Sequence, residues 1–205
     1  MDFRELLKRR RMVRSYRPDP PDPDAIDRIV RTVRRAPSGG FSQGQSLVVV
    51  TEPELRRRIA ERAGEADYVA GGGTPWMSTA PVQIVVCASE RRYHERYQKP
   101  DKLAQTGGKE VEWPVPYWFV DAGAAMMLIL MAAIDEGLGA GFFGHPEQET
   151  FLRELLGLPD DVVPIGVATI GYEDADPRAD RLTSRFTEAR RPLEQVVHRE
   201  RWGGV

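Results

Sequence analysis

The sequence predicts one domain in which helices pack against a central sheet, the α/β class in its broad sense. The length of 205 residues suits one sizeable domain and is marginal for two. Three short apolar runs, at 47–51, 82–88 and 162–170, have the β-branched composition of buried strands. Longer stretches with helical spacing lie between them, and the sequence shows neither an internal repeat nor a domain boundary. We therefore expect residues 1–205 to fold as a single domain.

The first part of the chain predicts two helices joined by an extended arm. Apolar residues at helical spacing in 3–7 predict a short helix that ends near Arg10. Four prolines in 18–23 exclude regular structure there and predict the arm. Asp24 is a suitable N-cap for the second helix, which must end before Pro37.

The middle of the chain predicts an amphipathic helix at 52–63 and a flexible glycine-rich turn at 71–75. The segment 91–116 is mostly polar and contains two glycines and three prolines. A long irregular segment inside a compact domain is usually functional or mobile. We therefore expect a lid, or an arm that crosses to another subunit.

The segment 121–136 is the most apolar part of the chain and predicts a helix that is buried on every face. One domain of this size rarely buries such a helix unaided, so we expect a subunit interface along it. Its uninterrupted apolar stretch, 122–134, is too short to cross a bilayer. A glycine-rich stretch at 137–141 closes the helix, and 147–156 predicts a further helix.

The composition argues against several classes of protein. A net charge of −2 and a pI near 6.0 are unlike those of a nucleic-acid binder. A mean hydropathy of −0.44 argues against an integral membrane protein, and the N-terminus lacks the apolar core of a signal peptide, so we expect a cytoplasmic protein. The only cysteine, Cys87, predicts a buried thiol and no internal disulfide. His94 and His198 have no ligand partners at useful spacing, so no metal site is predicted.

Two neighbouring motifs point to a ligand. Arg10, Arg11 and Arg14 place three guanidiniums close together near the N-terminus. A Pro-Ser-Gly-Gly turn at 37–40 then precedes the first apolar run. Guanidiniums match phosphate oxygens, and glycine lets backbone N–H groups approach a ligand closely. The two motifs together predict a site for a phosphorylated cofactor.

The order of these motifs resembles the FMN-dependent nitroreductase family along almost the whole chain. Further matching stretches are Ala80-Pro81-Val82, Asp121 to Ala125, Gly137-Leu138-Gly139, Leu155 to Pro159 and Arg190 to Leu193. The resemblance implies an α+β fold of three layers, with a central mixed sheet between helices, and a homodimer with a long buried interface helix. It also implies two FMN molecules at the interface and hydride transfer from NAD(P)H, through flavin N5, to a nitroaromatic, quinone, enone or similar acceptor.

The resemblance also assigns the site residues. It implies a pocket of arginines for the FMN phosphate and ribityl chain: Arg10, Arg11, Arg14, Arg190 and Arg191. It implies a group that approaches the isoalloxazine ring from the partner subunit: Pro37, Ser38, Gly39, Phe41 and Gln43, the last near the polar edge of the ring. Phe143 and Gly144 occupy the position whose backbone N–H faces flavin N5. The hydride chemistry itself belongs to the cofactor. His145 directly follows Gly144, which makes it the one candidate proton donor.

Two positions leave the reaction open. Met12 stands where most relatives carry serine and where the flavin-cleaving branch that makes dimethylbenzimidazole carries aspartate. Phe41 replaces the usual asparagine, and that same branch shares the phenylalanine. A flavin-cleaving enzyme and a flavin- or deazaflavin-binding module with little turnover are therefore kept as alternatives. The sequence does not choose between NADH and NADPH.

Overall fold

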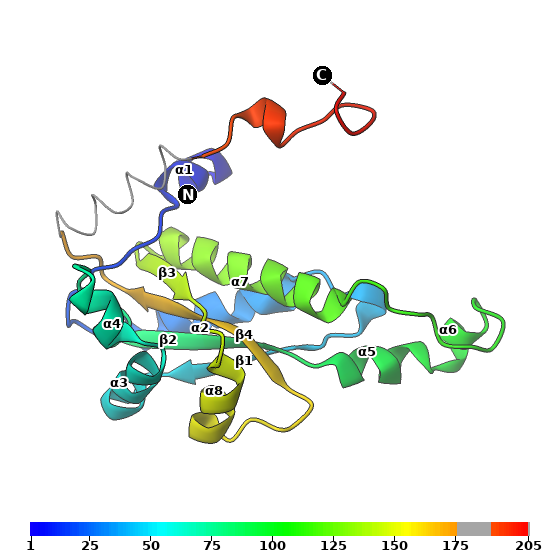
Figure 1. Cartoon of the computed structure of the whole chain (residues 1–205), viewed down its shortest axis with the longest axis horizontal. Coiled ribbons are helices and arrows are strands. Elements are labelled where there is room, and N and C mark those ends of the chain that lie inside the picture. The colour runs from blue at the N-terminus through cyan, green and yellow to red at the C-terminus, as the bar shows by residue number, and fades with distance from the viewer. Residues whose placement is uncertain (176–189, 205) are drawn as a thin grey trace.

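A computed structural model of the chain describes residues 1–175 and 190–204. Its sheet has four strands in the order β1 (Gln45–Val50), β2 (Val82–Ala88), β4 (Val163–Gly171) and β3 (Gly139–Phe143) (Figure 1). Three of these strands are the predicted ones, with β2 found at the predicted bounds. The sequence analysis missed β3 because Gly139 and Gly141 suggested a turn. Glycine is needed there for close packing, since a Cβ on Gly141 would lie 2.5 Å from the carbonyl oxygen of Val13.

The sheet differs from the expected mixed sheet, because all three strand pairs among the described residues are antiparallel. The connections explain the difference. Helices α3 (Pro53–Arg62) and α4 (Glu65–Ala70) return the chain from β1 to its neighbour β2 in the reverse direction. Helix α8 (Gln148–Leu156) does the same between β3 and β4.

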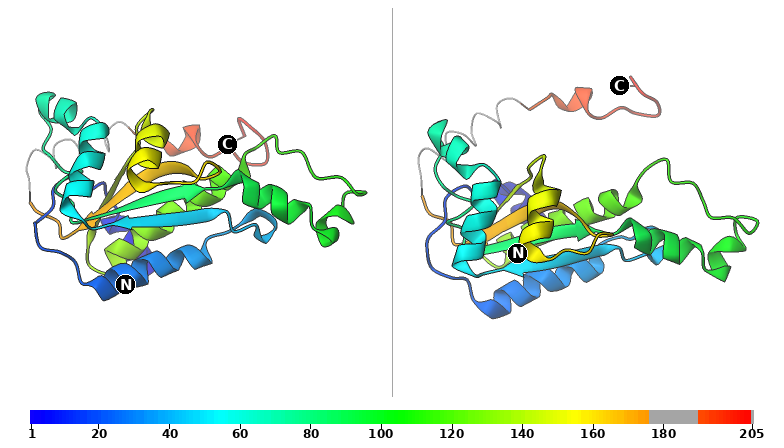
Figure 2. Two further views of the ribbon diagram at one scale, coloured as in Figure 1. Left: turned by 90° about the horizontal axis from the view of Figure 1, so that it is seen from below. Right: turned by 60° about the horizontal axis from the view of Figure 1, so that its bottom comes forward.

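Helices cover both faces of the sheet, which confirms the three-layer α+β arrangement (Figure 2). One layer contains α2 (Pro23–Arg31) and α7 (Tyr117–Asp135), and the other contains α3 and α8. Alternate residues of β2 serve the two layers. Ile84 and Val86 join the core with α2 and α7, whereas Val85 and Cys87 join the core with α3 and α8. A strand buried on both faces has no polar alternation, as the sequence indicated.

The start of the second helix differs from the prediction. The short first helix, α1 (Phe3–Arg9), lies where it was expected. Helix α2 is capped by Asp22 and not by Asp24, because the Asp22 side chain accepts the backbone N–H of Asp24 at 3.0 Å. Pro23 occupies the first turn, where a missing N–H costs nothing. A 3₁₀ turn, η1 (Thr32–Arg35), extends α2 and ends before Pro37 as predicted.

Helix α7 is longer than predicted, and it is not buried on every face within one chain. The side chains of Tyr117, Val120 and Met127 are 46%, 52% and 46% exposed. Over 19 residues with a hydropathy of 1.8, α7 is the one helix among the described residues that is long and apolar enough to span a membrane. Half of that span is nevertheless buried against the sheet, as in the core helix of a globular domain.

The segment 91–116 is partly helical, contrary to expectation. Helix α5 (Glu90–Tyr97) and the single turn α6 (Pro100–Leu103) occupy its first half and project from the body of the molecule (Figure 1). Ion pairs between successive turns support this polar helix, including Arg91 with Glu95 at 3.4 Å. The chain then returns without regular structure to the start of α7.

Candidate functional site

The first predicted motif is an extended segment that lies against the sheet. The backbone N–H of Val13 donates to the carbonyl oxygen of Ala140 in β3 at 3.1 Å. Side chains alternate along an extended chain, so Arg11 takes the opposite side from Arg10 and Arg14. Arg11 forms an ion pair with Glu173, just beyond β4.

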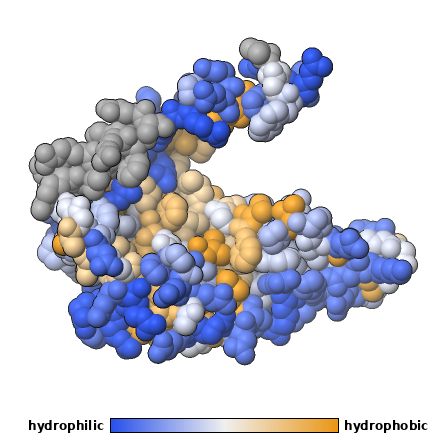
Figure 3. Space-filling view, viewed as in Figure 1, coloured by the Kyte–Doolittle hydropathy of each residue, from blue (hydrophilic) through white to orange (hydrophobic). Residues whose placement is uncertain are grey.

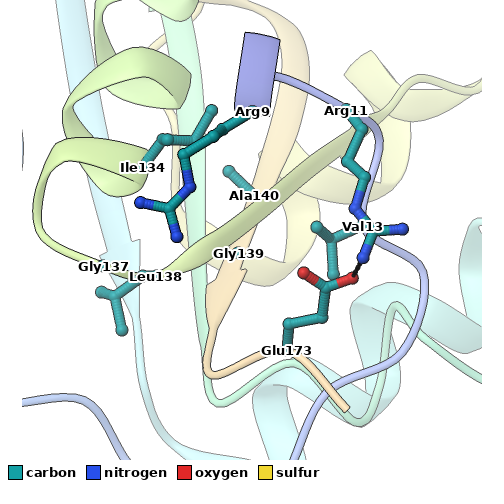
Figure 4. Close-up of a pocket in the computed structure, with 9 residues that line it drawn as sticks. All are labelled: Arg9, Arg11, Val13, Ile134, Gly137, Leu138, Gly139, Ala140 and Glu173. Carbon is teal, nitrogen blue, oxygen red and sulfur yellow. Dashed lines mark hydrogen bonds and ion pairs between the residues drawn. The ribbon is translucent and has the colours of Figure 1, made fainter. Parts of the chain in front are cut away.

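Figure 4 shows where Arg11 points. Arg11 and Glu173 line a cavity of about 90 Å³, with Arg9 on its other side. The floor of the cavity is the glycine-rich stretch Gly137 to Ala140, at the C-terminal end of α7. The three arginines of the motif therefore divide into two groups. Arg11 pairs with the Glu173 carboxylate, whereas Arg10 and Arg14 lie on the opposite side of the segment.

Arg10 has a second arginine as a neighbour. It is half-buried, and its guanidinium lies 3.7 Å from the Met12 sulfur. Partial burial, followed by repulsion from Arg190, lowers the pKa of Arg10. Like charges held together in this way favour an anion between them. Arg191, the next residue along the chain, is exposed.

Arg14 lies beside a pair of packed aromatic rings. Its guanidinium carbon is 5.8 Å from the ring centroid of Trp76, a cation–π distance. Trp76 in turn packs edge to face on Phe143, with the ring centroids 5.8 Å apart. The exposed Gly144 follows Phe143 at the end of β3. The structure thus brings Arg14, Phe143 and Gly144 close together in space.

His145 starts the turn that leads into α8. Its backbone N–H donates to the Gln148 side chain at 3.1 Å, and its Nδ1 accepts the backbone N–H of Glu147 at 3.1 Å. Only Nε2 is therefore left to exchange a proton with a ligand. The contacts of His145 are those of a helix start, and its role as a proton donor stays a prediction.

The second predicted motif is a tightly held turn, 38–43. The backbone N–H of Gly39 donates to Asp121 Oδ2 at 2.7 Å, and that of Gln43 donates to Ser38 Oγ at 2.6 Å. Arg96 Nε donates to the carbonyl oxygen of Gly40 at 2.9 Å. These bonds come from α7, from α5 and from within the turn.

The turn presents an aromatic side chain to solvent. Phe41 is 73% exposed and has a φ of 63°, a left-handed conformation that is rare for an aromatic residue. Gln43, with a φ of 52°, and Pro37 are also exposed. Strained backbone with an exposed ring is typical of a functional turn.

One chain does not bring the two motifs together. The turn is attached to Asp121 near the N-terminal end of α7, whereas the N-terminus of the chain contacts Asp135 at the other end. The 14 residues from Asp121 to Asp135 span about 21 Å of helix. The arginines and the turn therefore lie at opposite ends of α7.

Sequence reasoning missed the two residues that organise these groups. Asp121 was part of a matching motif but had no role, although a carboxylate within so apolar a helix signals a buried partner. Trp76 carried no sequence signal, since it lies in a turn between Pro75 and Met77.

Comparison with known proteins places these groups in context. The model of the nitroreductase family matches residues 7–172. The chain is 32% identical over 196 residues to an FMN reductase (NAD(P)H) of Bacillus subtilis strain 168, covering 93% of this chain and 70% of that protein. It is 25% identical over 214 residues to human iodotyrosine deiodinase 1, covering 96% of this chain and 68% of that protein. Among solved structures, a nitroreductase family protein from Streptococcus pneumoniae TIGR4 superposes with a TM-score of 0.71 at 21% identity, covering 97% of this chain and 100% of that one.

Proposed function

The chain belongs to the nitroreductase family and is a flavin-dependent oxidoreductase that uses FMN and NAD(P)H, and from this we propose that it is a cytoplasmic homodimer whose FMN sites each combine two subunits. The proposed reaction passes a hydride from NAD(P)H to a nitroaromatic, quinone, enone or similar small acceptor.

The residues present fit FMN. Its phosphate carries close to two negative charges and needs several fixed cations. The half-buried Arg10 is repelled by the exposed Arg190, and Arg14 lies four residues further along the chain. An anion bound by both guanidiniums relieves this repulsion. We assign the phosphate to these three arginines, with Arg191 assisting at the exposed rim.

The separation of the two motifs along α7 is the observation that carries the dimer. A two-fold interface is self-complementary, so two α7 helices packed antiparallel place the N-terminal end of each beside the C-terminal end of the other. That arrangement brings the turn of one copy to the arginines of the second copy, twice per dimer.

The surface supports the same arrangement. Figure 3 shows apolar residues gathered on the face formed by α7 and β3, beneath the segment that ends the chain. Tyr117, Phe119 and Val120 of α7 are at least 41% exposed. Helix α1 buries no residue, and its Phe3 is 67% exposed. Exposed apolar residues gathered on one face are typical of a subunit interface.

Bound FMN would supply the hydride chemistry of this site. The chain's residues bind and orient it. Arg10, Arg14 and Arg190 hold the phosphate, and Phe143 with Gly144 presents a backbone N–H to the ring. The turn of the second copy covers the ring, with Gln43 near its polar edge, and excludes water. Arg11 contributes indirectly, since its ion pair with Glu173 fixes the segment that carries its neighbours.

Subunit complementation tests the shared site. Arg14→Ala damages the phosphate end of a copy, and Gly39→Val damages its turn. A mixed dimer of the two variants then contains one site with both defects and one intact site. Half of the dimers are then mixed, and each mixed dimer has one intact site out of two. Co-expression is therefore expected to restore about a quarter of the wild-type flavin content and activity.

The matched control pairs Arg14→Ala with Arg10→Ala. Both changes lie in the same half of the site, so their mixed dimer has no intact site and restores nothing. Activity in the first mixture that does not exceed the mean of its two parent variants refutes the shared site.

Purified protein distinguishes the remaining alternatives. An FMN absorption spectrum, with NAD(P)H oxidation that depends on an added quinone, supports the proposed reaction. Bleaching of the flavin in oxygen without turnover of an acceptor favours a flavin-cleaving enzyme. Bound flavin or deazaflavin with neither outcome favours a binding module. An iodinated tyrosine as acceptor in the same assay tests the activity that names the human relative.

A further inference from the structure

Asp121 is a buried carboxylate in the most apolar helix of the chain. It is 6% exposed, and a single oxygen, Oδ2, accepts two hydrogen bonds. One comes from the backbone N–H of Gly39 at 2.7 Å, and the other from the hydroxyl of Tyr93. A buried charge is retained only where donors compensate its lost hydration. Here one of those donors is the backbone of the exposed turn.

The second donor is itself firmly held. Tyr93 is fully buried, and its ring packs edge to face on Trp113 and Trp118 at centroid distances of 5.7 and 5.9 Å. Burial, together with its hydrogen bond to Asp121, raises the pKa of Tyr93. The phenol hydroxyl therefore keeps its proton and donates a hydrogen bond to Asp121 Oδ2. Asp121 and Tyr93 form a rigid support behind the turn.

The support determines the shape of the turn. With Gly39 fixed by Asp121, the carbonyl of the same residue accepts Ser42 Oγ at 2.6 Å, which closes the turn. Arg96 holds the next carbonyl, that of Gly40, and is itself anchored by Asp101 at 2.7 Å. Phe41 lies between these fixed points. Its left-handed conformation is unfavourable in isolation and persists only because the surrounding bonds impose it.

We propose that Asp121 is a positioning residue, which fixes the Gly39 backbone and so holds Phe41 in its strained, exposed orientation toward the flavin of the second copy. The inference rests on the proposed function. It predicts that Asp121 controls flavin affinity and acceptor recognition without touching either molecule.

Three variants test it: Asp121→Ala removes both bonds, Asp121→Asn keeps an oxygen acceptor but loses the charge, and Tyr93→Phe removes only the hydroxyl. Two quantities are measured, the exchange rate of the Gly39 amide in flavin-free protein and the flavin dissociation constant. Asp121→Ala is expected to raise each about tenfold or more, with smaller changes in the other two variants. The visible circular dichroism of bound flavin shifts with them, and the acceptor KM rises more than kcat falls.

The control is Ile129→Ala in the same helix. Ile129 is fully buried in the core, so this variant lowers the melting temperature while Gly39 exchange, flavin affinity and the flavin spectrum stay as in wild type. If Asp121→Ala does not fold, Asp121→Asn and Tyr93→Phe decide the question. Folded variants with wild-type flavin affinity and spectrum overturn the inference. Wild-type protein that binds no flavin overturns the proposed function instead.

Discussion

Glu65 offers a prediction whose magnitude follows from counted hydrogen bonds. Its carboxylate is 8% exposed, and one oxygen accepts the backbone N–H groups of Trp76, Met77 and Ser78 at 2.8, 2.6 and 3.1 Å. The loop that carries Trp76 toward Arg14 is therefore fixed from behind by α4. Glu65→Ala leaves three backbone donors without that acceptor.

Each unsatisfied buried donor costs about 1 kcal/mol or more, so Glu65→Ala is expected to destabilise the protein by about 3 kcal/mol. For a domain of this size that corresponds to a fall of roughly 6–12 °C in melting temperature. Glu65→Gln keeps an acceptor oxygen and loses only the charge, so its fall is expected to be about a third as large.

Thermal unfolding of flavin-free protein measures both effects. The matched control is Glu61→Ala on α3, where an exposed glutamate forms a surface ion pair with Arg57 at 3.4 Å and little change is expected. A Glu65→Ala protein that melts with the wild type refutes the reasoning that this carboxylate organises the loop.

Three further predictions concern the site and the segment 91–116. Arg14→Ala is expected to weaken flavin binding ten- to a hundredfold, about 1.5–3 kcal/mol for a lost charge-assisted bond, and to yield colourless protein on gel filtration; a fully loaded yellow variant contradicts this. Gly141→Ala forces a Cβ to within 2.5 Å of the Val13 carbonyl oxygen, so the arginine segment must move and both stability and flavin content fall, whereas a wild-type melting curve contradicts it. Hydrogen bonds from the imidazole of His94 to the carboxylates of Glu110 and Glu90 raise the pKa of His94. The ion pair of His94 with Glu110 therefore stabilises the contact between α5 and the returning chain while His94 is protonated, and it is lost as pH rises through that raised pKa. Amide exchange in 104–116 is expected to accelerate with pH beyond its intrinsic trend, and His94→Gln is expected to abolish the excess.

The sequence predicted the elements better than their relations. The bounds of β2 followed from a run of apolar residues, and those residues are local. The direction of the neighbouring strands could not be predicted in this way, because it depends on the path of the helices that connect one strand to the next. Gly141 looked like a turn because the backbone of Val13, which requires the glycine, is remote in sequence. Asp24 was chosen as a cap where Pro23 shifted the start of the helix by two residues.

The same limit applies to the site. The arginine motif and the turn could be predicted to bind a ligand because each is continuous in sequence. The separation of Arg11 from Arg10 and Arg14 could not be predicted. It depends on the extended segment lying against β3, where alternate side chains point to opposite sides. The apolar character of α7 predicted an interface, but only the structure shows that the two motifs lie at its opposite ends.

Placing half of each site at either end of α7 has a thermodynamic consequence. If each site is completed only in the proposed dimer, flavin binding and subunit association are linked, and each strengthens the other. Retention of the cofactor then depends on protein concentration, so dilution releases flavin even at a constant intrinsic affinity. Added FMN conversely holds the dimer together at concentrations where the empty subunits separate.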